Sequence, residues 1–207
     1  MKDKNDEVES TGESGIQPEV RRQAKMPIFH TLQGLCFAAI LAAMSIVLGK
    51  FLQIPNPFQE FIRISFENLP VILAGLTLGP IAGALVGTVA DLIGCLLYGY
   101  TINPIITLGA ASVGFVSGFM ANYIIKKPLV LKVIVSVSFA HIIGSVLIKS
   151  AGLAAWYLAT YELGYWEFVA WRLLNYVLIG IAEGVIIYLL YKNRAFKKQL
   201  ERMCKKK

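Results

Sequence analysis

The most restrictive feature of this sequence is a series of long apolar runs that are almost free of charge. Only seven Lys/Arg and six Asp/Glu occur between Met26 and Tyr191, and 56% of the 207 residues are hydrophobic. A helix needs about 20 mainly apolar residues to cross a bilayer, and the longer runs reach that length. The sequence therefore predicts an integral membrane protein. It excludes a disordered chain, a coiled coil and an ordinary cytosolic enzyme.

The apolar runs predict an all-α bundle of six transmembrane helices. Their approximate bounds are Thr31–Phe51, Phe66–Leu78, Ile81–Tyr98, Ile105–Ile125, Leu129–Leu153 and Phe168–Tyr191. The second run is the shortest, because Gly79-Pro80 ends it and proline is poorly tolerated inside a helix. The chain thus divides into a polar and disordered N-terminal tail (1–27), a six-helix membrane domain (28–192) and a basic tail (193–207).

The distribution of basic residues predicts the orientation of the bundle. Basic residues precede the first run, bracket the join between the fourth and fifth runs, and follow the sixth run, where eight Lys/Arg occur. The alternate connections, at about 53–64, 99–104 and 154–167, carry few. Because cytoplasmic loops are enriched in Lys and Arg, both termini are predicted to be cytoplasmic and these three connections to face outside.

Six ionisable residues lie within or at the ends of the predicted spans. They are Glu67, Asp91, His141, Lys149, Arg172 and Glu183. A charge at the bilayer centre costs at least about 2.5–3.5 kcal/mol, so such residues are typical of functional sites. All except His141 and Glu183 fall in the predicted outer half. Interhelical salt bridges, with Asp91 pairing Lys149 or Arg172, are the structural alternative, together with snorkelling of long side chains near helix ends.

The outer half of the bundle also gathers aromatic and amide side chains. These residues are typical of an interfacial anchoring belt, but together with the cations they also suit a flat anionic ligand. Aromatic rings would stack on it, Lys149 and Arg172 would neutralise its carboxylates, and Asp91 would accept from its N–H groups. The predicted substrate-binding residues are Arg63, Asp91, Tyr98, Tyr100, Asn103, Lys149, Trp156, Arg172 and Asn175.

Small residues recur every four positions in two parts of the sequence. Gly75, Gly79, Gly83 and Gly87 form one series, and Ala38/Ala42 and Ala39/Ala43 form two pairs in the first span. Such spacing permits close helix packing in lipid. The glycines are expected to hold the bundle together. The alanines are expected either to pack inside it or to form a docking face for another membrane subunit.

Motifs for catalysis are absent from the sequence. It has no G-x-x-x-x-G-K-[ST] phosphate loop, no H-E-x-x-H and no nucleophile elbow, and its three cysteines are widely separated. We therefore expect no ATPase or other enzymatic activity in this chain, no metal, no cofactor and no nucleic-acid partner.

Several motifs resemble a known family. These are Arg63-Ile-Ser-Phe-Glu-Asn-Leu-Pro70, Gly79-Pro80-Ile-Ala-Gly83 with Gly87, Asp91-Leu-Ile-Gly94, and Trp171-Arg172-Leu-Leu-Asn175-Tyr176 followed by Glu183. They resemble the substrate-binding (S) subunits of energy-coupling factor (ECF) vitamin transporters, and are most similar to the folate-specific type. The alanine pairs of the first span match the AxxxA pattern of that family.

The resemblance implies a function and a set of partners. An S subunit of this type would capture folate or a close pterin outside a bacterial-type plasma membrane, in contact with membrane lipid. It would deliver the vitamin inward when docked, through Ala38, Ala39, Ala42 and Ala43, on one transmembrane coupling (T) subunit and two cytoplasmic ATPases that use ATP. An S subunit for riboflavin or thiamine is the nearest alternative. A stand-alone channel or secondary carrier, a membrane-embedded enzyme and a structural assembly factor are more distant ones.

Overall fold

Helices account for nearly all of the secondary structure in the computed structural model, which describes residues 32–51, 53–56, 59–125, 128–154 and 165–204. The elements in chain order are α1 (Leu32–Phe51), β1 (Ile54–Asn56), β2 (Gln59–Ile64), α2 (Asn68–Leu78), α3 (Pro80–Tyr98), α4 (Pro104–Phe119), η3 (Met120–Ile124), α5 (Leu129–Ala140), η4 (His141–Ile148), α7 (Tyr165–Lys192) and α8 (Arg194–Cys204). The two η segments are π-helical, and residues 149–154 continue η4 as α-helix.

Five helices in this part of the chain are long and apolar enough to cross a membrane. Their bounds are Leu32–Phe51, Pro80–Tyr98, Pro104–Ile124, Leu129–Ala154 and Tyr165–Lys192. They confirm the predicted all-α membrane fold. The remaining predicted span corresponds to α2, whose 11 residues extend about 16 Å, roughly half the thickness of the hydrocarbon core.

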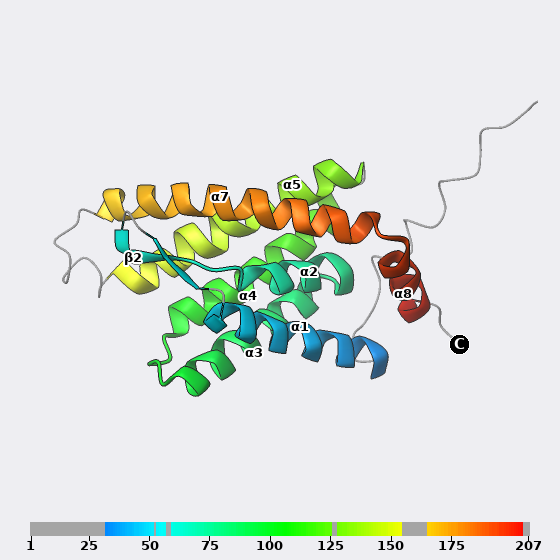
Figure 1. Ribbon diagram of the computed structural model, residues 1–207, viewed down its shortest axis with the longest axis horizontal. Helices are drawn as coiled ribbons and strands as arrows, with labels where there is room; N and C mark the ends of the chain where they lie inside the picture. The colour runs from blue at the N-terminus through cyan, green and yellow to red at the C-terminus, as the bar shows by residue number, and fades with distance from the viewer. Residues whose placement is uncertain (1–31, 52, 57–58, 126–127, 155–164, 205–207) are drawn as a thin grey trace, which may run out of the picture.

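The long helices lie roughly along one direction, so the bundle has two distinct ends (Figure 1). The start of α1 and the end of α7 lie at the same end, beside α8. The β1–β2 strands and the turn between α3 and α4 lie at the opposite end, which we call the hairpin end. The side of the membrane on which each end lies stays a prediction. The predicted tail 1–27 and most of the predicted connection 154–167 fall outside the described residues.

Helix α2 occupies the centre of the bundle, because all of its residues from Asn68 to Leu78 are buried. It ends at Gly79, whose φ of 101° lies in the left-handed region that favours glycine. Pro80 then begins α3 at a position where its missing N–H costs nothing. The predicted break at Gly79-Pro80 is therefore confirmed.

The glycines of α2, α3 and α4 bring three backbones together. A Cβ added to Gly83 would lie 2.7 Å from the Cα of Gly75, and one added to Gly118 would lie 2.7 Å from the Cα of Pro80. Side chains on these residues would hold the helices apart. Because lipid supplies no hydrophobic drive between helices, this close approach is a main source of their association.

The segment predicted as a loop at 53–64 contains a short antiparallel hairpin. Ile54 pairs with Ile64 and Pro55 with Arg63, and an irregularity follows before Asn56 meets Gln59. The prolines at 55 and 57 suggested irregular backbone, but proline is compatible with a short edge strand. The hairpin lies between α1 and α2 in the chain.

Candidate functional site

Two hollows of different chemistry occur among the described residues. The larger, of about 450 Å³, is a groove between α5–η4 and α7 with a mostly aliphatic lining. Its rim residues Ile134, Val177 and Ile181 are 51–63% exposed, and in a transmembrane bundle such a surface faces lipid. The smaller cavity, of about 100 Å³, lies near the hairpin end and is the candidate site. We call it the polar pocket.

The polar pocket is lined by residues of α1, α2, α3 and α4, of the segments that follow α1 and α3, and of the α-helical segment that continues η4. They include Ser45, Gln53, Glu67, Asn68, Asp91, Tyr98, Tyr100 and Lys149. Four of the nine predicted substrate-binding residues are among them: Asp91, Tyr98, Tyr100 and Lys149. Among the residues of the described ranges, no group of three His, Cys, Asp or Glu side chains gathers in metal-binding geometry.

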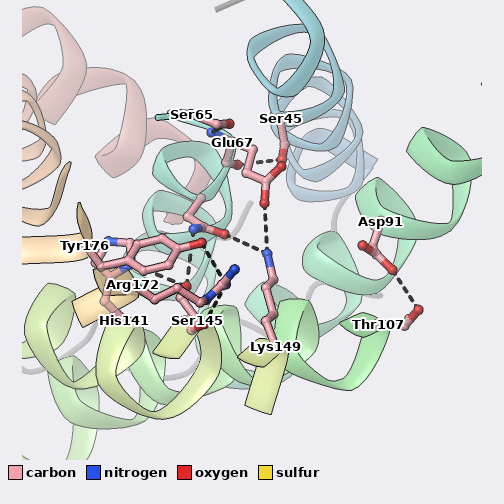
Figure 2. Close-up of polar contacts among 11 residues, drawn as sticks. Ser45, Ser65, Glu67, Asp91, Thr107, His141, Ser145, Lys149, Arg172 and Tyr176 are labelled. Carbon is pink, nitrogen blue, oxygen red and sulfur yellow. Dashed lines mark hydrogen bonds and ion pairs between the residues drawn. The ribbon is translucent and has the colours of Figure 1, made fainter. Parts of the chain in front are cut away.

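Lys149 forms an ion pair inside the pocket. Its Nζ lies 2.9 Å from Oε1 of Glu67 and also donates to Oδ1 of Asn68 at 3.3 Å (Figure 2). The lysine side chain is 7% exposed and that of Glu67 is 37% exposed. The sequence argument proposed Asp91 as a salt-bridge partner of this lysine, but the partner is Glu67, from the residue just before α2. Lys149 is consequently not an uncompensated cation.

Asp91 lies on the wall of the polar pocket and is held by a different partner. The hydroxyl of Thr107 on α4 donates to its Oδ2 at 2.6 Å (Figure 2). Neither ion pair of the described residues includes Asp91, so the structural alternative of a salt bridge with Lys149 or Arg172 is not observed. Its carboxylate instead joins α3 to α4 and presents negative charge to the pocket.

Two tyrosines at the end of α3 form an aromatic wall of the pocket. The ring centroids of Tyr98 and Tyr100 lie 6.1 Å apart in an edge-to-face arrangement. The hydroxyl of Tyr98 donates to the backbone carbonyl of Ile46 on α1, and Lys50 Nζ lies 4.8 Å from the Tyr98 ring centroid. Tyr98 is thereby fixed, whereas Tyr100 is 49% exposed.

Arg172 on α7 does not line the polar pocket. It is 8% exposed and donates to the carbonyl of Ser145 at 3.0 Å and to the hydroxyl of Tyr176 at 3.4 Å. Its guanidinium carbon lies 5.6 Å and 5.4 Å from the ring centroids of Phe168 and Tyr176. Within the described part of the chain its Nε has no partner and no carboxylate lies within 4.0 Å.

The other predicted site residues have different positions. Asn103 uses its amide structurally, because Oδ1 accepts from the N–H of Ile105 at 3.0 Å and Nδ2 donates to the carbonyl of Gly152 at 2.9 Å. Asn103 thereby caps α4, and its contact with the ligand stays a prediction. Asn175 is buried on α7. Arg63 lies in β2, but its side chain, like all of Trp156, falls outside what the structure describes.

The two alanine pairs of α1 face different surroundings. Ala38 and Ala42 are 9% and 7% exposed and belong to the hydrophobic core. Ala39 and Ala43 are exposed. The first pair therefore fits the expectation of packing inside the bundle, and only the second pair presents a surface to another subunit.

The sequence argument missed the role of Asn68 and underestimated that of Glu67. Glu67 precedes the short α2 and Asn68 begins it, and a polar residue is ordinary at the start of a helix. A spacing signal was nevertheless present, because His141, Ser145 and Lys149 recur every four residues along η4 and the residue that follows it. Lys149 contacts both Glu67 and Asn68.

The ion pair gives a stability prediction that needs no ligand. Lys149→Met should lower the free energy of unfolding by about 1–2 kcal/mol, because it leaves the partly buried Glu67 carboxylate without its counter-charge. The double variant Glu67→Gln with Lys149→Met should recover most of that loss. Thermal unfolding in detergent measures both. Equal destabilisation by the single and double variants would show that the pair does not couple energetically.

Comparisons with known proteins agree on one family. Residues 30–198 match the model described as ECF-type riboflavin transporter, S component. The folate transporter FolT of Clostridium novyi (strain NT) is 28% identical over 116 residues, which cover 53% of this chain and 61% of FolT. The match thus spans about three fifths of that relative's length.

Solved structures show the same fold. FolT bound with folic acid matches with a TM-score of 0.61 and 23% identity, covering 80% of this chain and 97% of FolT. The S component of a bacterial ECF transporter matches with a TM-score of 0.58 and 24% identity, covering 78% and 94%. Because the family model extends over most of the chain, this multi-pass membrane protein belongs to the S components of ECF-type transporters.

Proposed function

We propose that this chain is the vitamin-capture subunit of an ECF-type ABC importer and that it binds folate or a close pterin. The observation that carries the proposal is the polar pocket, which is lined by the Asp91 carboxylate and by Tyr98 and Tyr100. The similarity to the folate transporter FolT supports this choice of vitamin.

The groups of a folate molecule match the chemistry of the pocket. A pterin ring has an edge of amino and ring N–H donors, which a carboxylate such as Asp91 can accept. Its flat face suits the tyrosine rings. Its glutamate tail needs a cation. Since Lys149 is neutralised by Glu67 at 2.9 Å, Arg172 is the better candidate, because no described carboxylate compensates its charge.

Folate binding requires the polar pocket to widen. Its volume of about 100 Å³ is below the roughly 300 Å³ at which small-molecule sites begin. Gln53, next to the hairpin, and the exposed Tyr100 lie at its edge. Movement of the hairpin and of the turn after α3 would open a path toward Arg172, in the manner of a lid.

Delivery of the vitamin needs partners that supply energy. We propose that the chain docks on a transmembrane T subunit and two cytoplasmic ATPases in the cell membrane, with both of its own termini cytoplasmic. Membership of the S components supports this assignment. The exposed Ala39 and Ala43 are the docking contacts that remain compatible with the structure.

Riboflavin is the second candidate ligand, because the matching family model is described as a riboflavin transporter component. Riboflavin is also flat and rich in hydrogen-bonding groups, but it has no carboxylate. A requirement for Arg172 therefore distinguishes the two vitamins.

Calorimetric titration of the purified protein tests the proposal. Folic acid should bind more tightly than riboflavin and than pteroic acid, which lacks the glutamate. Arg172→Met should weaken the binding of folic acid by about 1.5–3 kcal/mol, roughly ten- to a hundredfold, and the binding of pteroic acid much less. Lys192→Met, which removes an exposed cation at the far end of the same helix, is the matched control. Tighter binding of riboflavin would contradict the assignment to folate.

A further inference from the structure

A line of hydrogen-bonded side chains runs from the polar pocket into the bundle. Lys149 Nζ donates to Asn68 Oδ1 at 3.3 Å, and Asn68 Nδ2 donates to Ser145 Oγ at 3.3 Å. Ser145 Oγ lies 3.4 Å from His141 Nδ1, and His141 Nε2 lies 2.7 Å from Glu183 Oε2. Figure 2 shows how Lys149, Ser145 and His141 follow one another along η4. We call these five residues the polar chain.

The chemistry of its two ends gives the polar chain a direction. The Lys149 ammonium can only donate, and a Glu183 carboxylate can only accept. In a neutral imidazole the single proton is then on Nε2, facing Glu183, which leaves Nδ1 of His141 to accept from the Ser145 hydroxyl. Ser145 in turn accepts from the Asn68 amide. All four hydrogen bonds consequently point from the pocket toward Glu183.

Burial of the ionisable groups of the polar chain costs free energy, because they lose their contact with water. His141 is 3% exposed and Glu183 is completely buried. Oε1 of Glu183 has no hydrogen-bond partner among the described residues. An ionisable pair within membrane-spanning helices, with one oxygen unsatisfied, is more than bundle packing requires, because aliphatic side chains would fill the same space without a desolvation cost.

The polar chain also touches the proposed cation site. The His141 ring stacks on that of Tyr176 with centroids 5.2 Å apart and planes inclined by 27°. The Tyr176 hydroxyl accepts from Arg172 at 3.4 Å, and Arg172 also donates to the backbone carbonyl of Ser145. A change at Glu183 can therefore alter the polar pocket through Asn68 and Lys149. It can also alter the position of Arg172 through Ser145 and Tyr176.

We propose that Glu183 and His141 are positioning residues for the ligand site. As the terminal acceptor, Glu183 fixes the tautomer of His141, which orients Ser145 and then the Asn68 amide. The oxygen of that amide holds Lys149 in the wall of the pocket. This inference rests on the proposed vitamin-binding function, and it assigns a role in binding to two residues that do not line the polar pocket.

Binding of folic acid to variants of the chain tests this role. His141→Phe with Glu183→Leu keeps an aromatic ring on Tyr176 and removes both ionisable groups, so the bundle should remain folded. Folic acid should then bind about five- to tenfold more weakly. Ser145→Ala, which cuts the polar chain with little change in volume, should cause a similar loss. Combined with the double variant it should add little, because both remove the same coupling.

Two further variants separate positioning from stability. Glu183→Gln retains a neutral acceptor for His141 Nε2, so its affinity for folic acid should stay within about twofold of wild type. Glu183→Leu removes the acceptor and should lower that affinity. Ser136→Ala removes another buried hydroxyl, one without a partner among the described residues, and should leave affinity unchanged. Wild-type affinity in either Ser145→Ala or the folded double variant would overturn the proposal.

A measurement without ligand keeps the inference separate from the proposed function. The sequence contains two histidines, so His30→Gln leaves His141 as the only one. Its ¹⁵N imidazole chemical shifts should show a neutral ring protonated at Nε2. A proton on Nδ1 would overturn the proposed direction of the polar chain. A wild-type protein that binds neither folic acid nor riboflavin would instead overturn the proposed function, and the tautomer would still decide the direction.

Discussion

Replacing Gly114 with alanine is expected to lower the free energy of unfolding by at least about 3 kcal/mol. The added Cβ would collide with the backbone carbonyl of Gly83 and lie 2.9 Å from the backbone N of Ala84. Both obstacles are main-chain atoms of α3, so no side chain can rotate away and the two helices must separate. Overpacking costs about 1–3 kcal/mol even where side chains can adjust. Thermal unfolding in detergent, without ligand, measures the effect.

Gly184 provides the matched control for this prediction. It is also a helical glycine of a membrane-spanning segment, but a Cβ added there meets nothing within 4 Å. Gly184→Ala should leave stability unchanged or raise it by up to about 1 kcal/mol, the gain in helix propensity. Similar destabilisation by both variants would mean that helix contacts between α3 and α4 are looser than the structure shows.

The contrast between these glycines illustrates how much of the fold the sequence could predict. The long helices were predictable because a run of about 20 apolar residues identifies a span without any tertiary information. The break at Gly79-Pro80 was predictable because both residues act locally on the backbone. The spacing of Gly75, Gly79, Gly83 and Gly87 predicted close packing, but only the structure shows that Gly83 meets Gly114 of α4, whereas a Cβ added to Gly184 would meet nothing within 4 Å.

The site was less predictable, because its contacts join residues that are far apart in the chain. Asp91 and Lys149, which the sequence argument selected from their charge and depth, both line the polar pocket. The sequence could not pair them, because Lys149 meets Glu67 across 82 residues and Asp91 meets an uncharged threonine. His141 and Glu183, 42 residues apart, were noted only as separate groups at different depths. Depth along a helix can be estimated from sequence, but the direction a side chain faces cannot.

The alanines of α1 show the same limit on a single helix. Positions 38, 39, 42 and 43 contain two pairs spaced by four, and such spacing places the members of a pair on one face. It does not show which face points inward. The structure buries Ala38 and Ala42 in the hydrophobic core and exposes Ala39 and Ala43. The proposed docking surface accordingly keeps two of the four alanines that the sequence suggested.

Ala39→Trp combined with Ala43→Trp is expected to abolish co-purification with the T subunit and ATP-driven folic acid uptake. Close approach of small surfaces is what allows helices to associate in lipid, and two indole rings would block it. Because both alanines are exposed, the rings can extend into lipid without disturbing the bundle. Affinity for folic acid should stay within about twofold of wild type. The measurements are affinity purification of the assembled transporter, uptake into vesicles, and calorimetric titration.

Ala38→Trp with Ala42→Trp separates a docking defect from a folding defect. These alanines are 9% and 7% exposed and pack in the core, so indole rings there should destabilise the bundle and reduce ligand binding as well. The Ala39/Ala43 variant should be defective only in assembly and transport, whereas the Ala38/Ala42 variant should be defective in folding. Normal transport by the Ala39/Ala43 variant would show that this face does not dock the T subunit. Loss of folic acid binding in the same variant would show that α1 packs in the membrane with Ala39 and Ala43 facing the bundle.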